Sequence, residues 1–370
     1  CFSQNNQAKL KGNFAMTQIR IFMPLIMALA TFMSPANIRA AEPVRVRIGI
    51  LGIDNFGSVA YTEFLNKPNA TGIFAGVRVV AACPVVSKDY PQSADLTERW
   101  KQQLLNMYQK PKNSAEAVPP IDFVETPEEL LKRVDGVMIF SLDGRMHQRQ
   151  AEMVLKAGKR LFISRPIAAS FDDTTAILKY AEETKTPCWS SSQHRYSAGF
   201  SGMRNHPEVG RVIGCDVYGG WAVDAPIADQ FTRPLHSLET LQTIMGPGIA
   251  SVSCVSTPTA ESMTAVWKDG RVGTYRGIKQ GAVKYSATVF GDKGVSTAGI
   301  YGHGIPVNGV VPTTDKYVGY EGLAIELAKF FKGGPVPVSA SETLEIFGAL
   351  QAAEISKAQN GAMIPVKTAK

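Results

Sequence analysis

The sequence contains little cysteine and no cysteine motif. Its five cysteines show no Cys-x-x-Cys spacing, and none has a histidine at a spacing typical of metal ligands. The four beyond residue 40, Cys83, Cys188, Cys215 and Cys254, each lie in or beside an apolar, strand-like run. We expect buried free thiols and no metal site, although an exported protein could pair two of them.

The sequence also lacks a block of positive charge. Four of its 39 basic residues lie in residues 1–40, which contain no acid, so the formal charge of +7 falls to +3 for the remainder. No run of lysine and arginine interleaved with aromatic residues is present, so a nucleic-acid partner is not expected.

No apolar segment is long enough for a comfortable membrane span. Ile21–Met33 has 13 residues, whereas a spanning helix needs about 20. A short charged stretch, Met16–Arg20, precedes it, and small residues follow at 34–36 and 40–41, which is the pattern of a signal peptide. No twin-arginine pair is present, so we expect export by the Sec-type route and a periplasmic or secreted protein. An uncleaved anchor is the alternative.

The remaining chain is predicted to form two domains. Residues 44–167 alternate apolar strands with helices, which is typical of a doubly wound parallel sheet, a Rossmann α/β domain. Residues 168–370 are predicted to form an α+β domain with a large, mostly antiparallel sheet and helices over 235–245, 321–331 and 341–359. From the alternation of Val283, Tyr285, Ala287 and Val289 we expect an apolar sheet face that a second copy covers, as a homodimer or homotetramer.

The first strand leads into a glycine turn, Gly52-Ile53-Asp54-Asn55-Phe56-Gly57. A strand, glycine turn and helix form the pyrophosphate-binding unit of dinucleotide-binding proteins, with the spacing G-x-G-x-x-G. Here Asp54 replaces the second glycine, where a side chain crowds a phosphate and a carboxylate repels it. The second strand also ends in Cys83-Pro84 where an acid usually holds the ribose. A strand, turn and helix without a nucleotide is therefore the competing interpretation.

Polar side chains follow the other predicted parallel strands. Ser141, Asp143 and His147 come after the fourth strand, and Arg165-Pro166 comes after the fifth. Because ligands of doubly wound sheets bind beyond the carboxyl ends of the strands, these residues are candidate ligand contacts. For His147 the alternative is a purely structural role at a helix terminus.

The order of these motifs resembles the Gfo/Idh/MocA family, relatives of glucose–fructose oxidoreductase and inositol dehydrogenase, from about Val44 to Val366. Beyond the glycine turn, the resemblance is carried by MHQRQAEMVLKAGKRLFISRPIAAS, LHSLETLQTIMGPG and ETLEIFGALQAAEISKAQNG. Among family members the chain looks most like an exported bacterial branch whose glycine turn reads G-x-D.

The resemblance implies NAD or NADP as cofactor. It implies cofactor contacts from the six residues of the glycine turn and from Ser141, His147, Arg165 and Pro166. It further implies a substrate contact from Arg195, which matches a recurrent family arginine; Asp143 is a second candidate substrate contact because of its place at the carboxyl edge of the sheet.

The resemblance also implies catalytic roles for His236 and Arg165. His236 matches the family's proton-transfer histidine, but Thr232 stands where its aspartate partner should be. Arg165 replaces the family's lysine and Ser164 its glutamate. An arginine keeps its proton near neutral pH, so Arg165 can orient a substrate but not relay a proton, whereas His236 can titrate.

The function that these residues predict is an NAD(P)-dependent oxidoreductase acting on a sugar, polyol or glycoside, with His236 as general acid/base. Asp54, Pro84, Arg165 and Thr232 depart from the family pattern and leave two alternatives open. One is a carbohydrate-binding or structural protein without redox turnover. The other is a non-redox lyase or glycosidase that uses a resident NAD.

Overall fold

The computed structural model describes residues 45–107, 119–221, 232–300, 302–303 and 318–367, without the side chains of residues 232, 233, 302 and 303. The predicted signal segment and the side chain of Thr232 therefore lie outside the described residues.

Six parallel strands form the first sheet, in the order β3-β2-β1-β4-β5-β6. Their bounds are Val46–Leu51 (β1), Val77–Cys83 (β2), Asp122–Phe123 (β3), Gly136–Ile139 (β4), Arg160–Ser164 (β5) and Cys188–Ser191 (β6). The strand order reverses between β1 and β4, which are hydrogen-bonded neighbours. The predicted doubly wound Rossmann sheet is thus confirmed, and its ligand crevice is expected above this reversal.

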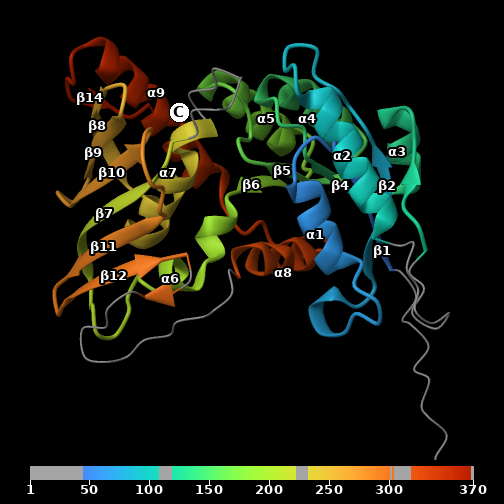
Figure 1. Ribbon diagram of the computed structural model, residues 1–370, viewed down its shortest axis with the longest axis horizontal. Coiled ribbons are helices and arrows are strands. Elements are labelled where there is room, and N and C mark those ends of the chain that lie inside the picture. Colours follow the sequence, from blue (N-terminus) through green and yellow to red (C-terminus); the bar gives the residue numbers. More distant parts are fainter. Residues whose placement is uncertain (1–44, 108–118, 222–231, 301, 304–317, 368–370) are drawn as a thin grey trace, which may run out of the picture. The chain divides into compact units, whose positions relative to one another are not determined.

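Helices cover both faces of this sheet because alternate strand residues point to opposite sides. Ile48 and Ile50 pack in one apolar cluster with helix α1 (Gly57–Leu65) and helix α8 (Gly319–Phe331). Leu51 belongs to the opposite cluster, which contains residues of α3 (Pro127–Arg133), α4 (His147–Lys156) and α5 (Phe171–Glu183). Helix α2 (Ser93–Asn106) begins beside the glycine turn, where Ser93 donates to Asp54, and its Leu104 packs in the same cluster as α1. Figure 1 shows α8, near the end of the chain, beside α1.

Capping side chains fix where two of these helices begin. The Thr126 hydroxyl accepts a hydrogen bond from the Glu129 amide at α3, and the Ser170 hydroxyl accepts one from the Asp173 amide at α5. Both residues satisfy an amide that a helix start leaves without a partner.

The second sheet has eight strands in the order β13-β12-β11-β7-β10-β9-β8-β14. Their bounds are Val212–Gly220 (β7), Ile249–Ser256 (β8), Ala260–Trp267 (β9), Val272–Ile278 (β10), Ser286–Gly291 (β11), Val295–Gly299 (β12), Gly302–His303 (β13) and Ile364–Pro365 (β14). Neighbouring strands are antiparallel except β7 and β10, which are parallel. The predicted mostly antiparallel sheet is confirmed.

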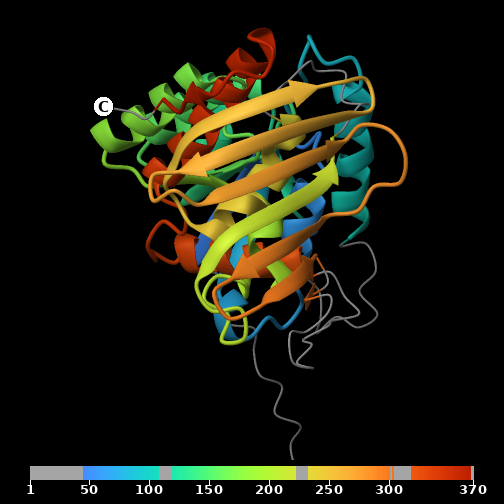
Figure 2. The same cartoon turned by 90° about the vertical axis from the view of Figure 1, so that its left-hand side faces the viewer.

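Helices α7 (Thr232–Met245), α9 (Ala340–Ala358) and the short α6 (Ala198–Ser201) pack on one face of this sheet. Leu235, Leu238, Leu241 and Met245 of α7 are buried, as their helical spacing predicts. Figure 2 shows the opposite face of the sheet without a helix in front of it.

The prediction that Ala287 and Val289 lie on this open face was wrong. Ala287 and Val289 are 1% and 0% exposed and pack in the apolar core. The reason is that β11 begins at Ser286, so these two side chains alternate toward the helices, while Val283 lies before the strand. Val255, Val272 and Val295 of β8, β10 and β12 are instead exposed.

Two further expectations can be compared with the fold. Cys83, Cys188, Cys215 and Cys254 are buried free thiols, as predicted. Strand β6 continues the Rossmann sheet beyond the predicted domain boundary at residue 167, and the boundary itself stays a prediction. Within the described ranges, no helix is both long and apolar enough to cross a membrane.

Candidate functional site

The glycine turn between β1 and α1 packs tightly against the end of β4. Gly52 has a φ of 73°, and a Cβ there would overlap the Ser141 hydroxyl and lie 2.8 Å from the Ser141 amide nitrogen. A Cβ on Gly57 would lie 2.8 Å from the Phe140 ring. The first and third glycines of the motif therefore allow this close approach.

Asp54, which replaces the second glycine, is turned into the protein. Its carboxylate is 1% exposed and accepts hydrogen bonds from the Leu142 amide at 2.8 Å and the Ser93 hydroxyl at 2.6 Å. Burial raises the pKa of Asp54 to about 6, against the opposing effect of these hydrogen bonds. The side chain joins the glycine turn to α2 and to the loop after β4, so its charge, rather than its bulk, is what acts on a nearby anion.

The tip of the turn keeps donors for an anion. Among the described residues, the amides of Asn55 and Phe56 donate to no acceptor, whereas the Gly57 amide donates to Asn55 Oδ1 at 2.8 Å. Adjacent free amides before a helix form an anion-binding site. The turn therefore fits a pyrophosphate despite Asp54.

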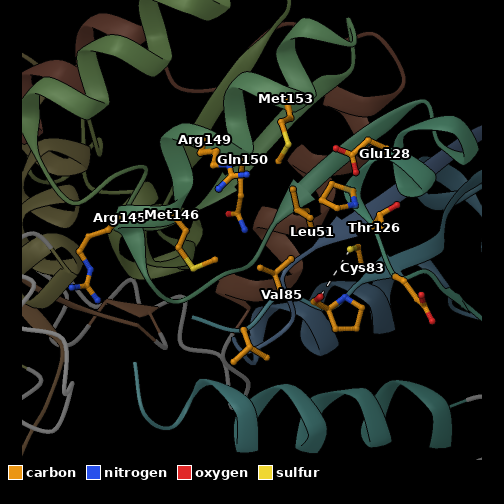
Figure 3. Close-up of a pocket in the computed structure, with 14 residues that line it drawn as sticks. Leu51, Cys83, Val85, Thr126, Glu128, Arg145, Met146, Arg149, Gln150 and Met153 are labelled. Atoms are coloured by element: carbon orange, nitrogen blue, oxygen red, sulfur yellow. Dashed lines mark hydrogen bonds between the residues drawn. The ribbon is translucent and has the colours of Figure 1, made fainter. Parts of the chain in front are cut away.

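A pocket of about 680 Å³ lies beside the turn, at the carboxyl ends of β1 and β2. Figure 3 shows Arg145, Arg149 and Gln150 of the α4 region across the pocket from Thr126, Glu128 and Cys83. This volume is in the range of small-molecule sites. Sequence reasoning missed the α4 residues of the lining, although Met146, Arg149, Gln150 and Met153 repeat at the three- and four-residue spacing of one helix face.

The predicted contacts after β4 hold the backbone of the site. Asp143 is 1% exposed and accepts hydrogen bonds from the Ser87 hydroxyl at 2.6 Å and from Arg145 Nε at 2.8 Å. Arg145 also holds the pKa of Asp143 below its usual value, although burial opposes this. The Asp143 carboxylate thus has its hydrogen-bond partners within the protein, and the Ser87 hydroxyl is one of them.

His147 is fully buried between two backbone segments. Its Nε2 lies 2.8 Å from the Ser141 carbonyl oxygen, and its Nδ1 lies 2.9 Å from the Pro166 carbonyl oxygen. Burial lowers the pKa of His147, against the carbonyl oxygens on both sides of the ring, which favour its protonated form. His147 therefore fastens the loop after β4 to the Arg165-Pro166 segment, whose peptide bond is cis.

A second group of polar side chains lies at the carboxyl ends of β5 and β6. The register pairs Ser164 with Ser191, and Arg165 and Ser192 are the next residues after the two strands. The Ser192 hydroxyl lies 2.5 Å from Nδ1 of His236 on α7. The His194 ring stacks on His236 with centroids 4.4 Å apart, and Tyr285 packs edge-on against His194 at 4.6 Å. The structure thus brings His236 near Arg165, whose charge contributes to the lowered pKa of His236.

Ser192 engages one ring nitrogen of His236 within the protein. The buried Ser192 oxygen accepts from the His194 amide at 3.1 Å. It also lies within hydrogen-bond distance of His236 Nδ1, as donor or acceptor according to the tautomer of the ring, which leaves Nε2 as the ring nitrogen that can meet a ligand. Burial, with contributions from Arg165 and His194, lowers the pKa of His236 well below its usual value, so the neutral ring prevails.

Glu239, one helical turn after His236, fixes the Ser192 backbone. It is 5% exposed and accepts from the Ser192 amide at 2.8 Å. Burial raises the pKa of Glu239, while Arg195 opposes the shift. The Arg195 side chain is 11% exposed and lies between Glu239 and Glu342, with a hydrogen bond to Gln242. The predicted substrate contact Arg195 is therefore placed as a brace between the segment after β6 and helices α7 and α9.

Comparison with known proteins agrees with this arrangement. Residues 46–192 match the model of an oxidoreductase family with an NAD-binding Rossmann fold. The fold and this match define the class as an NAD-binding oxidoreductase. That model is the model of the Gfo/Idh/MocA family, which this part of the chain matches. None of the curated proteins matches the chain.

Solved structures share the two-sheet architecture. A putative myo-inositol dehydrogenase from Sinorhizobium meliloti is 18% identical with a TM-score of 0.65, covering 87% of this chain and 100% of that one. Myo-inositol 2-dehydrogenase from Lactobacillus plantarum is 14% identical with a TM-score of 0.65, covering 88% and 100%. GenD2 from gentamicin A biosynthesis, in complex with NAD, is 16% identical with a TM-score of 0.65, covering 89% and 97%. At these identities the likeness concerns the fold.

Proposed function

We propose that the protein is an NAD(P)-dependent oxidoreductase that oxidises a hydroxyl-bearing carbon of a sugar or polyol, or reduces the corresponding carbonyl. The observation that carries this proposal is the meeting of the glycine turn with the His236–Arg165 group at the end of β5. Asn55 Nδ2 lies 3.5 Å from the Ser164 hydroxyl, and Arg165 is the next residue. The inositol dehydrogenases among the structural neighbours support a polyol as substrate.

The residues present fit a dinucleotide. The Asn55 and Phe56 amides would hold the pyrophosphate, and the pocket beside them would take the adenosine end. The pocket contains Glu125 and Glu128, which suit a ribose diol, and Arg149, which suits a ribose phosphate, so its residues fit either NAD or NADP. When bound, the nicotinamide supplies hydride transfer.

The chain's own residues supply orientation and proton exchange. Nδ1 of His236 is occupied by Ser192, so Nε2 is the atom that exchanges a proton with the substrate oxygen. The Arg165 guanidinium orients the substrate, and Ser192 and Glu239 hold the histidine and its strand in place.

Two further proposals concern the environment of the protein. The charged stretch and apolar segment within residues 16–33 support export to the periplasm or beyond, with removal of the leader. The exposed Val255, Val272 and Val295 on a sheet face without a helix support a homodimer or homotetramer.

The test begins with dinucleotide binding. Purified full-length protein is titrated with NADH and NADPH, and the absorbance of reduced nicotinamide is then followed over a panel of sugars, polyols and keto-sugars. We expect His236→Asn to lower kcat by about 10² to 10⁴ with little change in KM. His206→Asn, a histidine outside the site, serves as the control. Failure of both dinucleotides to bind, or full activity in His236→Asn, contradicts the proposal.

A further inference from the structure

The Arg165 guanidinium forms no ion pair and no hydrogen bond in the described part of the chain, although the Glu239 carboxylate is near enough to sense its charge. Other arginines of the fold form an ion pair: Arg145 pairs with Asp143, Arg195 with Glu239, and Arg271 with Asp269. No hydrogen bond or ion pair joins Arg165 to a described residue, although it is only partly exposed. A partly buried cation without a partner loses hydration that nothing in the protein replaces.

The groups around Arg165 do not supply the missing acceptor. Glu239 is the nearby acid, but its carboxylate accepts from the Ser192 amide and lies in an ion pair with Arg195. His236 is a neutral ring and supplies no negative charge. Tyr285 and Tyr320 also lie within reach of the Arg165 charge, but their hydroxyls are neutral. The site therefore offers a positive charge, and its described side chains leave the matching negative charge to a ligand.

We propose that the substrate carries a carboxylate group that binds the Arg165 guanidinium, so that the protein acts on a sugar acid or another hydroxy acid rather than on a neutral sugar. This inference rests on the proposed function and names its substrate class. A planar guanidinium binds both oxygens of a carboxylate through two parallel N–H donors, a geometry that a hydroxyl group cannot match. His236 then lies beside the same bound molecule, because the His236 ring is near enough to Arg165 to sense its charge.

The experiment compares matched pairs of ligands that differ in charge. Glucuronate and glucose, galacturonate and galactose, gluconate and glucitol, and glycerate and glycerol are titrated calorimetrically into the full-length protein, with and without NADH. Glucose 6-phosphate tests whether the anion site prefers a phosphate. Arg165→Gln and Arg165→Lys are compared with Arg211→Gln, which removes the same charge from an exposed position. Melting curves verify that each variant is folded.

We expect at least one carboxylate to bind the wild type tenfold or more tightly than its neutral partner. Arg165→Gln should weaken that carboxylate by about tenfold to a hundredfold, or about 1.4 to 2.8 kcal/mol, and leave the neutral ligands nearly unchanged. Arg165→Lys should retain part of the preference for the carboxylate over its neutral partner, because lysine keeps the positive charge but lacks the two parallel N–H donors. Arg211→Gln should resemble the wild type.

The inference is overturned if the neutral partners bind as well, if no carboxylate shows binding that depends on Arg165, or if glucose 6-phosphate is preferred to every carboxylate. The separate titration with NADH and NADPH tests the proposed function. Carboxylate binding without dinucleotide binding would refute the proposed oxidoreductase and support the carboxylate site. Dinucleotide-dependent turnover of neutral sugars alone would support the oxidoreductase and refute the carboxylate site.

Discussion

Replacing Asp54 with asparagine should tighten dinucleotide binding. The carboxylate is buried against the Leu142 amide and the Ser93 hydroxyl, and asparagine can keep both contacts, with Oδ1 toward the amide and Nδ2 toward the hydroxyl. The substitution thus removes a charge while retaining the shape. Asp54→Gly would be a poorer test, since it leaves two buried donors without an acceptor.

The magnitude follows from the position of the charge. Asp54 directly precedes the Asn55 amide, and consecutive Cα atoms are about 3.8 Å apart, so an anion on that amide lies within about 10 Å of the carboxylate. At about 10 Å, two unit charges repel by about 0.4 kcal/mol in water and by about 1.7 kcal/mol at an effective dielectric constant of about 20. Asp54→Asn should therefore lower the Kd of NAD(H) by roughly twofold to fifteenfold.

Protonation of Asp54 should have the same effect. Because burial raises the pKa of Asp54 to about 6, the wild-type carboxyl loses its charge as the pH falls through that value. Wild-type Kd should then decrease between about pH 7 and pH 5, while the Asp54→Asn profile stays flatter. Calorimetric titration of both proteins across this range measures the effect. Ser93→Ala, which removes a hydrogen bond to the ionised form, should move the wild-type transition to higher pH.

Three results would refute this reasoning. Weaker binding by a folded Asp54→Asn protein would mean that the carboxylate contacts the ligand favourably. Equal Kd values and equal pH profiles would mean that the anion lies too far from Asp54 to sense its charge. A transition that Ser93→Ala leaves in place would belong to another group.

Two further predictions concern the histidine pair. Ser192→Ala removes the hydrogen-bond partner of His236 Nδ1, so the limb of the pH–rate profile that reports His236 should move. An unmoved limb, as expected for the neighbouring control Ser191→Ala, would assign Ser192 a purely structural role. Burial, and to a smaller extent the charge of Arg165, lowers the pKa of His194 to about 3. Below about pH 6.5 the unfolded chain therefore binds a proton at His194 that the folded protein does not bind. The free energy of unfolding should fall as the pH drops from about 6.5 toward 3. Denaturant unfolding at several pH values should show a smaller fall in His194→Gln and an unchanged one in His206→Gln, and identical slopes in all three proteins would contradict the assignment.

The sequence by itself determined the elements and their order. The alternation of apolar residues in β1, the Thr126 and Ser170 caps and the apolar stripe of α7 depend on neighbours within a few residues, so periodicity reveals them. The family motifs likewise placed His236 and Arg165 at one edge of the fold, where the register of β5 and β6 and the Ser192 contact bring them together.

Only the tertiary structure decided where the polar side chains of the site point. Asp54 is turned inward by partners 39 and 88 positions away, and His236 is held by a serine 44 positions earlier. Arg195 lies among acids of α7 and α9, and α8 packs on the first sheet from near the end of the chain. Contacts between residues so distant in sequence leave no local periodicity, because they arise only when the sheets and helices pack together.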